Sequence, residues 1–177
     1  SQQNRIEAEA LVAELVQRLA AESGKPATYG VVTFSQAQQT LVEDLLDERR
    51  RAQPEIERHF TGTDEPVFVK NLENVQGDER DVMLFSICYG PDAAGKVHMN
   101  FGPLNLQGGE RRLNVAVTRA RRALVLIGHR PTLSQLGTAD SPARRFYDHL
   151  FNLVTRDSAG YSLIRGFRSG RQSGSTP

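Results

Sequence analysis

Apolar residues along the chain follow two spacings. Runs rich in apolar residues predict strands at 29–34, 67–70, 82–88 and 123–128. Apolar residues at every third or fourth position predict helices at about 4–20, 35–51, 110–122 and 140–156. Strands that alternate with helices, several of them apolar throughout, are typical of a parallel sheet covered on both faces. We therefore expect an α/β fold.

Polar residues mark where the first two helices begin. Asn4, with Glu7 three positions later, has the form of a capping box, in which each side chain satisfies a free amide of the first turn. Ser35 stands in the corresponding place before the second helix. A set of glutamines follows it: Gln36, Gln38 and Gln39. These amides either complete the cap or read a base edge, and from the residues alone we favour the cap.

Two segments carry many glycines and show no periodicity. Residues 89–109 are rich in Gly and Pro and are predicted to form a long loop. Residues 165–177 are mostly Gly, Ser and Arg, which is typical of a chain that cannot build a core. We therefore expect one domain over residues 1–157, followed by a flexible tail over 158–177.

The segment R-R-L-N-V-A-V-T-R-A-R-R at 111–122 is the most informative in the chain. Its pattern predicts one helix whose apolar face is formed by Leu113, Ala116, Val117 and Ala120. The same helix would carry the arginines Arg111, Arg112, Arg119, Arg121 and Arg122. A guanidinium is always charged and matches phosphate with two hydrogen bonds, so a rigid row of arginines suits phosphate binding. The alternative is a solvated helix with a basic surface.

Composition excludes several classes of protein. The hydrophobic fraction of 38% and the net charge of +1 are those of an ordinary globular protein, not of a chain that coats nucleic acid by bulk charge. Cys88 is the one cysteine, so an internal disulfide is excluded and a reducing compartment is favoured. No apolar stretch approaches the ~20 residues that span a bilayer. We expect a cytoplasmic protein with no membrane partner and no metal ligands of its own.

The segment Gly90–Lys96 fits G-x-x-x-x-G-K, the pattern of a phosphate-binding loop. Val97 follows it, where such loops carry the Ser or Thr that binds Mg²⁺. The following residues lack helical spacing, so the amides and dipole of a helix N-terminus are missing. We interpret the match as accidental.

The segment Q-G-D-E-R-D at 76–81 directly precedes a buried strand. Gly77 permits a close approach of the backbone to a ligand, and Gln76 and Glu79 present polar groups beside it. In open α/β sheets ligands bind at the carboxyl ends of strands, and this loop follows the strand at 67–70. An ordinary turn with solvated charges is the alternative.

Together these segments resemble the superfamily 1 DNA/RNA helicases. V-V-T-F-S-Q-A-Q, near 31–39, looks like motif IV, and the region 68–81 looks like motif V. The string L-N-V-A-V-T-R-A-R, within 111–122, looks like motif VI and is the most specific of the three. F-V-K-N-L-E-N-V-Q-G-D-E-R-D also resembles a bacterial group of large multi-domain helicase-like proteins. The resemblance implies the second RecA-like domain, a three-layer fold with a parallel central sheet.

The resemblance also implies roles for individual residues. In this family ATP and Mg²⁺ lie between two RecA-like domains and are held mainly by the first one, which this chain lacks. Arg119 would be the catalytic arginine finger on the γ-phosphate. Gly77 and Glu79 would approach the sugar and phosphates of ATP. Gln38 would match the glutamine of motif IV, and Arg121 would be the next arginine to bind ATP. Its alternatives are a structural role or a bridge to nucleic acid.

Partners follow from the same resemblance. The first RecA-like domain of the parent protein and single-stranded DNA or RNA are implied. Lys70, Asn71 and Gln76 would contact the strand, together with the loop at 89–109. Because half of the site is missing, the isolated domain is expected to be inactive.

The chain departs from the family pattern in motif IV. Phe34, Ser35 and Gln39 stand where T-P-Y-x-x-Q-R has its proline, tyrosine and arginine. This departure leaves open an alternative function, a non-catalytic RecA-like module that binds nucleic acid or protein.

Overall fold

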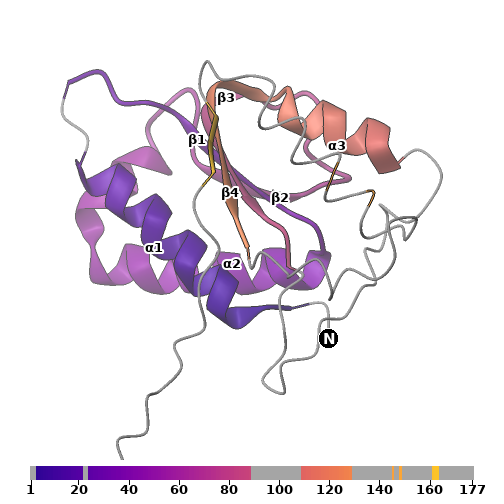
Figure 1. The fold of residues 1–177 in the computed structure, drawn as a ribbon. Coiled ribbons are helices and arrows are strands. Elements are labelled where there is room, and N and C mark those ends of the chain that lie inside the picture. The colour runs from indigo at the N-terminus through magenta and orange to yellow at the C-terminus, as the bar shows by residue number, and fades with distance from the viewer. Residues whose placement is uncertain are drawn as a thin grey trace, which may run out of the picture.

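The computed structural model of the protein describes residues 3–21, 24–88, 109–128, Arg145, Asp148 and residues 161–163. The elements are α1 (Arg5–Ala21), β1 (Tyr29–Thr33), α2 (Gln36–Ala52), the 3-10 helix η1 (Pro54–His59), β2 (Phe68–Asn71), β3 (Arg80–Ser86), α3 (Gly109–Val117), β4 (Ala120–Ile127) and β5 (Tyr161–Leu163). In Figure 1 the sheet lies at the centre, with α1 and α2 on one face and α3 on the other.

All five strands are parallel and lie in the order β2-β1-β3-β4-β5. Val31 of β1 lies opposite Val69 on one side and Leu84 on the other, and Leu84 lies opposite Val125. Every residue of β1 is buried, as expected for an inner strand with helices on both faces. The predicted parallel α/β fold is therefore confirmed.

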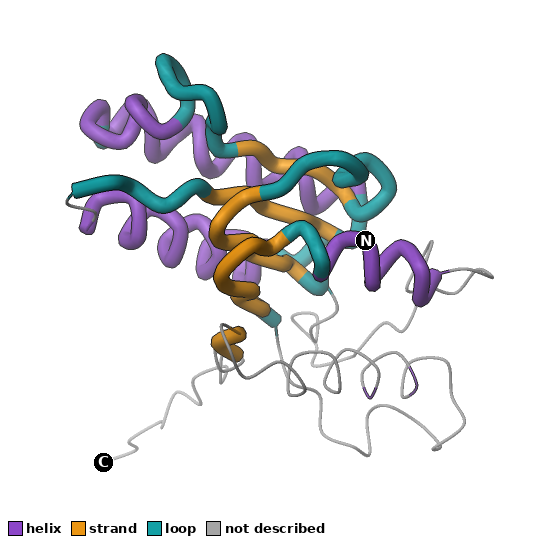
Figure 2. Tube along the Cα trace, turned by 90° about the horizontal axis from the view of Figure 1, so that it is seen from above, coloured by secondary structure: helices purple, strands orange, loops and turns teal. Residues whose placement is uncertain are grey.

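The apolar residues form one core on each face of the sheet. On the face of α1 and α2, Leu11, Leu15 and Leu84 are fully buried. On the face of α3, Leu113 packs with Phe85, among others. Figure 2 shows the strands between the helix pair and α3. None of the helices in the described part of the chain has the length and apolarity that crossing a bilayer requires.

The first two helices begin where the sequence predicts. The Ser35 hydroxyl accepts a hydrogen bond from the Gln38 amide at 3.1 Å and caps α2. Asn4 Oδ1 accepts from the Glu7 amide at 3.1 Å and caps α1. The second half of the predicted capping box is wrong, because the Asn4 N–H donates to Gln38 Oε1 at 2.7 Å and not to Glu7. A residue of α2 thus completes the cap of α1.

Glu7 instead points into the protein, where it is 4% exposed. Its Oε1 accepts hydrogen bonds from the Ser86 hydroxyl at 2.6 Å and from the Cys88 N–H at 2.7 Å. Its Oε2 is buried and has no hydrogen-bond partner within the described ranges. Burial raises the pKa of Glu7 to about 7, and burial next to Glu7 raises the pKa of the Cys88 thiol to about 12.

The raised pKa of Glu7 predicts a pH-dependent stability. Between pH 4.5 and about 7 the folded protein holds a proton that the unfolded chain has released. The free energy of unfolding should therefore fall as pH rises through this window, by about 3 kcal/mol, and level off above it. Glu7→Gln retains the accepting oxygen but does not titrate, so its stability should lack this slope. Urea unfolding of both proteins across pH 5–8 measures how the free energy of unfolding depends on pH. The same dependence in both proteins would contradict a raised pKa of Glu7.

The predicted arginine helix is shorter than expected. The helix α3 ends at Val117, Thr118 and Arg119 form a turn, and β4 begins at Ala120. Leu113, Ala116 and Val117 are buried as predicted, but Ala120 reaches the same core from a strand. Arg121 and Arg122 consequently lie on β4 and not on the helix.

The predicted tail also needs correction, because residues 161–163 form β5 and pair with β4. The sheet therefore extends beyond the domain boundary expected at 157. The predicted loop at 89–109, apart from Gly109, and most of the helix predicted at 140–156 lie outside the described residues. Arg145 and Asp148 are described and are helical.

Candidate functional site

The segment from Asn71 to Glu79 carries the chain from the carboxyl end of β2 to the amino end of β3. On the way Leu72 and Val75 are buried in the same core as Leu113 of α3. The segment at 76–81 was expected near the carboxyl ends of the strands, and this expectation is wrong for its last residues, because Glu79 directly precedes β3. Of the segment from Asn71 to Glu79, only the first residues lie there, and Glu79 reaches the opposite edge of the sheet.

At that edge the segment meets the turn between α3 and β4. The Arg80 N–H donates to the Arg119 carbonyl at 3.1 Å, and the Arg119 Nη1 lies 3.5 Å from Glu79 Oε1. Glu79 and Arg119 thus lie side by side although they are 40 positions apart in the sequence. The sequence offered no local signal for this contact.

Arg119 is held at the end of α3. Its Nε donates to the Val115 carbonyl at 3.1 Å, and its Nη2 lies 3.3 Å from the Thr118 hydroxyl. A guanidinium here also interacts favourably with the negative end of the helix dipole. The side chain is 24% exposed and its partner Glu79 is 50% exposed. Arg119 is therefore oriented by the end of its own helix and by Glu79, and its side chain is partly exposed.

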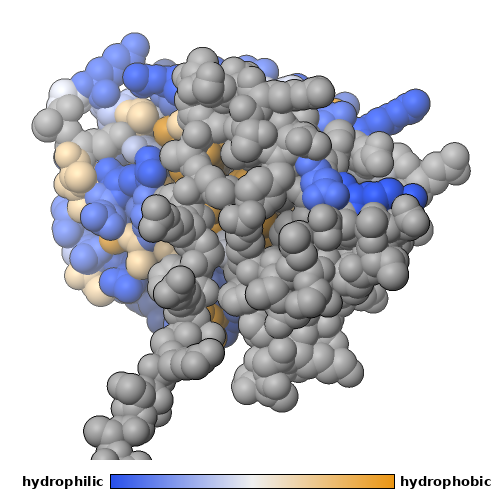
Figure 3. Space-filling model, in the orientation of Figure 1, coloured by the Kyte–Doolittle hydropathy of each residue, from blue (hydrophilic) through white to orange (hydrophobic). Residues whose placement is uncertain are grey.

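The surface around this pair is polar and open. Gly77 adopts φ +89°, a conformation that favours glycine, and no heavy atom lies within 4 Å of the position that a Cβ would take. Gln76 beside it is exposed. On α3, Arg111 and Arg112 are exposed, and Figure 3 shows hydrophilic side chains over this helix. The backbone at Gly77, two residues before Glu79, is therefore open to a ligand, whereas Arg111 and Arg112 lie near the start of α3, eight and seven positions before Arg119.

Four other predicted site residues are engaged within the protein. Gln38 is fully buried, and its Nε2 donates to the Asn4 carbonyl at 3.0 Å and to the Ser86 hydroxyl at 3.1 Å. Asn71 is 8% exposed and its Nδ2 donates to Gln36 Oε1 at 2.7 Å.

Lys70 forms a 2.5 Å ion pair with Asp78. Arg121 binds Glu65 with two hydrogen bonds, of 2.9 and 2.7 Å. Gln38 and Asn71 are buried among structural partners, whereas Gln76, Gly77 and Glu79 are exposed. Both arginines have protein partners and are partly exposed, Arg121 at 38% and Arg119 at 24%.

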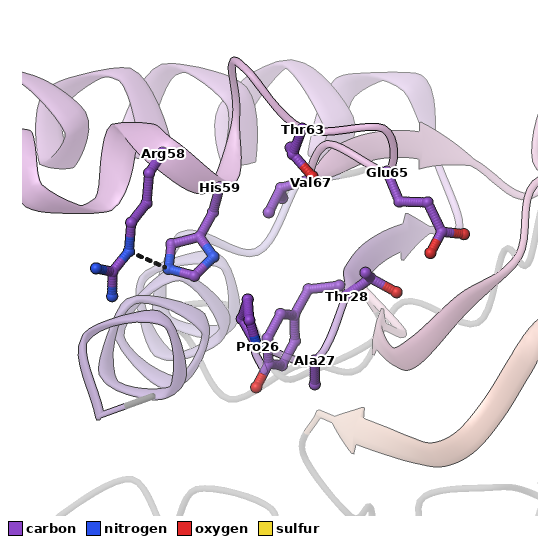
Figure 4. Close-up of a pocket in the computed structure, with 9 residues that line it drawn as sticks. Pro26, Ala27, Thr28, Arg58, His59, Thr63, Glu65 and Val67 are labelled. Carbon is purple, nitrogen blue, oxygen red and sulfur yellow. Dashed lines mark hydrogen bonds between the residues drawn. The ribbon is translucent and has the colours of Figure 1, made fainter. Parts of the chain in front are cut away.

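A pocket of about 160 Å³ lies elsewhere on the domain. Figure 4 shows Arg58 and His59 from η1 on one side of it and Pro26 and Ala27 on the other. Neither Glu79 nor Arg119 lines this pocket. The described residues contain no group of three or more His, Cys, Asp or Glu side chains placed to hold a metal ion.

The parallel sheet and its covering helices define a RecA-like α/β domain. Arg119 lies in the turn directly before β4, an inner strand of this sheet. The AAA domain family matches residues 1–131. An uncharacterized ATP-dependent helicase of Mycoplasma genitalium, MG140, is 37% identical over 118 residues, and its Mycoplasma pneumoniae homolog is 35% identical over 122 residues. Each alignment covers 65% of this chain.

Regulator of nonsense transcripts 1 of Caenorhabditis elegans is 27% identical over 132 residues, which is 75% of this chain. The aligned part spans only about a tenth of the length of these curated relatives, 10% and 11% for the first and third. The chain belongs to the AAA domain family and is a RecA-like domain of the superfamily 1 helicase type.

Proposed function

We propose that this chain is the second motor domain of an ATP-dependent helicase and that it supplies Arg119 to ATP bound on a preceding RecA-like domain. The observation that carries the proposal is the Arg119–Glu79 pair at an accessible edge of the sheet. The parent would couple ATP hydrolysis to movement along single-stranded DNA or RNA. Relatives named ATP-dependent helicases support this assignment.

The proposed chemistry needs a fixed positive charge beside the γ-phosphate. The Arg119 guanidinium supplies it and would stabilise charge that develops as the phosphoryl group is transferred. The carboxylate of Glu79 can accept hydrogen bonds from sugar hydroxyls, and Gly77 lets the backbone approach without a side chain in the way. Mg²⁺ would be held by the preceding domain.

Contacts to the single strand are proposed for Gln76, which is exposed, and for Lys70. The Lys70 ammonium must first leave Asp78, its partner in this structure. Asn71 is not proposed as a contact, because its side chain joins β2 to Gln36 at the start of α2. Gln38 is likewise not proposed as a nucleotide ligand, because its amide joins α1 to β3.

The alternative, a non-catalytic module, is favoured by one observation in motif IV. Gln39 stands where the family pattern has an arginine, and its Nε2 donates to Glu43 Oε1 at 2.9 Å and to the Val69 carbonyl at 3.2 Å. The side chain at this position therefore faces the protein and offers no cation to a phosphate.

A comparison of Mg²⁺-ATP hydrolysis tests the proposal. The chain alone should show no turnover above the uncatalysed background, and the full-length protein should hydrolyse ATP with stimulation by single-stranded DNA or RNA. Lys96→Ala serves as the control in the isolated chain. Turnover by the chain alone that this variant abolishes would contradict the proposal, because residues 90–96 would then be a working phosphate loop.

A further inference from the structure

Arg121 is the centre of a polar cluster that we call the Arg121 cluster, formed by Arg121, Glu65, Asp81 and Thr28. Arg121 Nη1 and Nη2 donate to the two oxygens of Glu65 at 2.9 and 2.7 Å. Its Nε donates to Asp81 Oδ1 at 3.2 Å, and Nη2 also donates to the Thr28 hydroxyl at 3.0 Å. Two parallel bonds to one carboxylate are the strongest geometry that an arginine forms with an acid.

The cluster joins the starts of three strands. Thr28 directly precedes β1, Asp81 is the second residue of β3, and Arg121 is the second residue of β4. The Thr28 N–H donates to Asp81 Oδ2 at 3.0 Å, and the Asp81 N–H donates to the Thr28 hydroxyl at 2.9 Å. Figure 4 shows Thr28 and Glu65 at the same end of the pocket. The cluster therefore fixes these strands relative to the loop that carries Glu65.

The register between β3 and β4 shifts within this cluster. Arg80 lies opposite Ala120 and Val82 lies opposite Ala123, so Arg121 and Arg122 together face the single residue Asp81. An extra residue in one strand breaks the regular ladder of backbone hydrogen bonds. Side-chain bonds from Arg121 to Asp81 and Thr28 hold the strands together where that ladder is irregular.

Arg119 lies two residues before Arg121 at the same irregular junction. The Arg119 carbonyl accepts from the Arg80 N–H at 3.1 Å. The Arg80 side chain is itself fixed, because its Nη2 donates to the Pro66 carbonyl at 2.9 Å and its guanidinium stacks on Phe68 at 4.8 Å. The backbone of Arg119 is thus held by Arg80 on one side and by the strand that Arg121 anchors on the other.

The charged groups of the cluster stabilise one another's ionised forms. The hydrogen bond from Arg121 lowers the pKa of Glu65, and the same bond raises the pKa of Arg121. Burial opposes ionisation of Asp81, but the Thr28 amide and Arg121 together lower its pKa. Arg121 is held by two short hydrogen bonds to the carboxylate of Glu65 and by a third bond to Asp81. Arg119 differs from it, because its one carboxylate contact is to Glu79 at 3.5 Å and its other partners are a backbone carbonyl and a hydroxyl.

We propose that Arg121 is a positioning residue for Arg119 and not a ligand of the nucleotide. This inference rests on the proposed function of Arg119. The Arg121 cluster holds the start of β4, and the start of β4 holds the turn from which the Arg119 side chain extends. A displacement of about 1 Å at a catalytic group can lower a rate by about 100-fold, so this anchoring bears on the rate of hydrolysis.

Glu65 contacts Arg121 from the loop before β2. A substitution of Glu65 therefore distinguishes a positioning role of Arg121 from a direct contact with the nucleotide. Arg121→Gln and Glu65→Gln are compared in the full-length protein, with steady-state ATP hydrolysis at saturating single-stranded nucleic acid. Both should lower kcat by roughly tenfold and leave KM for ATP unchanged. The double variant should lower kcat no further than Arg121→Gln alone, because both substitutions break the same bidentate contact. Arg51→Gln, which removes a positive charge from an exposed residue at the end of α2, is the matched control.

Two results would overturn the inference. One is a higher KM in Arg121→Gln beside wild-type kinetics in Glu65→Gln, which would make Arg121 a nucleotide ligand. The other is wild-type kcat and KM in both variants, whether or not their melting temperatures differ from that of the wild type. Arg119→Ala is measured in parallel: if it retains full activity, the proposed function fails as well. If only Arg119→Ala lowers kcat, the positioning role alone fails.

Discussion

Arg119→Ala should lower the kcat of ATP hydrolysis by the full-length protein by about 10³-fold or more, the range found for arginine fingers. In the proposed role the guanidinium would act on charge that develops during phosphoryl transfer, so KM for ATP should change little. Arg119→Lys should recover only a small part of the activity, because an ammonium lacks the planar fork that contacts two oxygens. Steady-state hydrolysis with saturating single-stranded nucleic acid measures both effects.

The control for this prediction is Arg51→Gln, which removes a positive charge from an exposed residue at the end of α2. It should hydrolyse ATP at the wild-type rate. The folded state of Arg119→Ala is checked by circular dichroism, since Arg119 also donates to the Val115 carbonyl at the end of α3. A folded Arg119→Ala protein with wild-type kcat would favour the non-catalytic module.

Gln38→Ala should destabilise the chain by about 3 kcal/mol, the combined effect of a small cavity and unpaired buried polar groups. Gln38 is fully buried and bonds both the N–H and the carbonyl of Asn4, as well as the Ser86 hydroxyl. Truncation would leave these groups without their partner and loosen the start of α1. Urea unfolding at pH 7 measures the change in the free energy of unfolding.

Thr40→Ala is the matched control, because Thr40 lies on the exposed side of the same helix and donates only to the Gln36 carbonyl. Its effect should stay within about 0.5 kcal/mol, as for most surface substitutions. If Gln38→Ala unfolds at the wild-type urea concentration but raises KM for ATP, Gln38 is a nucleotide ligand and its structural role is wrong.

The strands could be predicted from the sequence because each is a short run rich in apolar residues. The run around Leu84 and the run around Val125 are buried on both faces, so their composition alone indicates inner strands. The end of α3 could not be predicted in the same way. Ala120 continues the helical spacing of Leu113 and Ala116, and no Gly or Pro separates Val117 from β4.

The roles of the arginines depend on contacts that are distant in sequence. Helical spacing grouped Arg119 with Arg121, whereas the structure places one in a turn and the other on a strand, bonded to Glu65. Glu65 lies 56 positions from Arg121, and no local pattern indicates that contact. Glu7 shows the same limit: the capping-box pattern is local, but its partner Ser86 lies 79 positions away.

The predicted roles of Gly77 and Glu79 at the nucleotide stay predictions. Gly77 and Glu79 belong to a polar segment that precedes a buried strand, and the structure leaves both at the surface. Gln38 was named from its place in motif IV, where the spacing of a motif cannot reveal whether a side chain faces solvent or the core. Burial depends on how α1 packs on α2, which is a tertiary property.

The central claim is that Arg119 acts on a nucleotide that another domain holds. The most direct measurement is the affinity of the full-length protein for ADP–aluminium fluoride, which imitates the transferring phosphoryl group, beside its affinity for ADP. Arg119→Ala should weaken binding of the fluoride complex about 100-fold or more and leave ADP binding unchanged. Equal affinity of both proteins for ADP–aluminium fluoride would contradict the account.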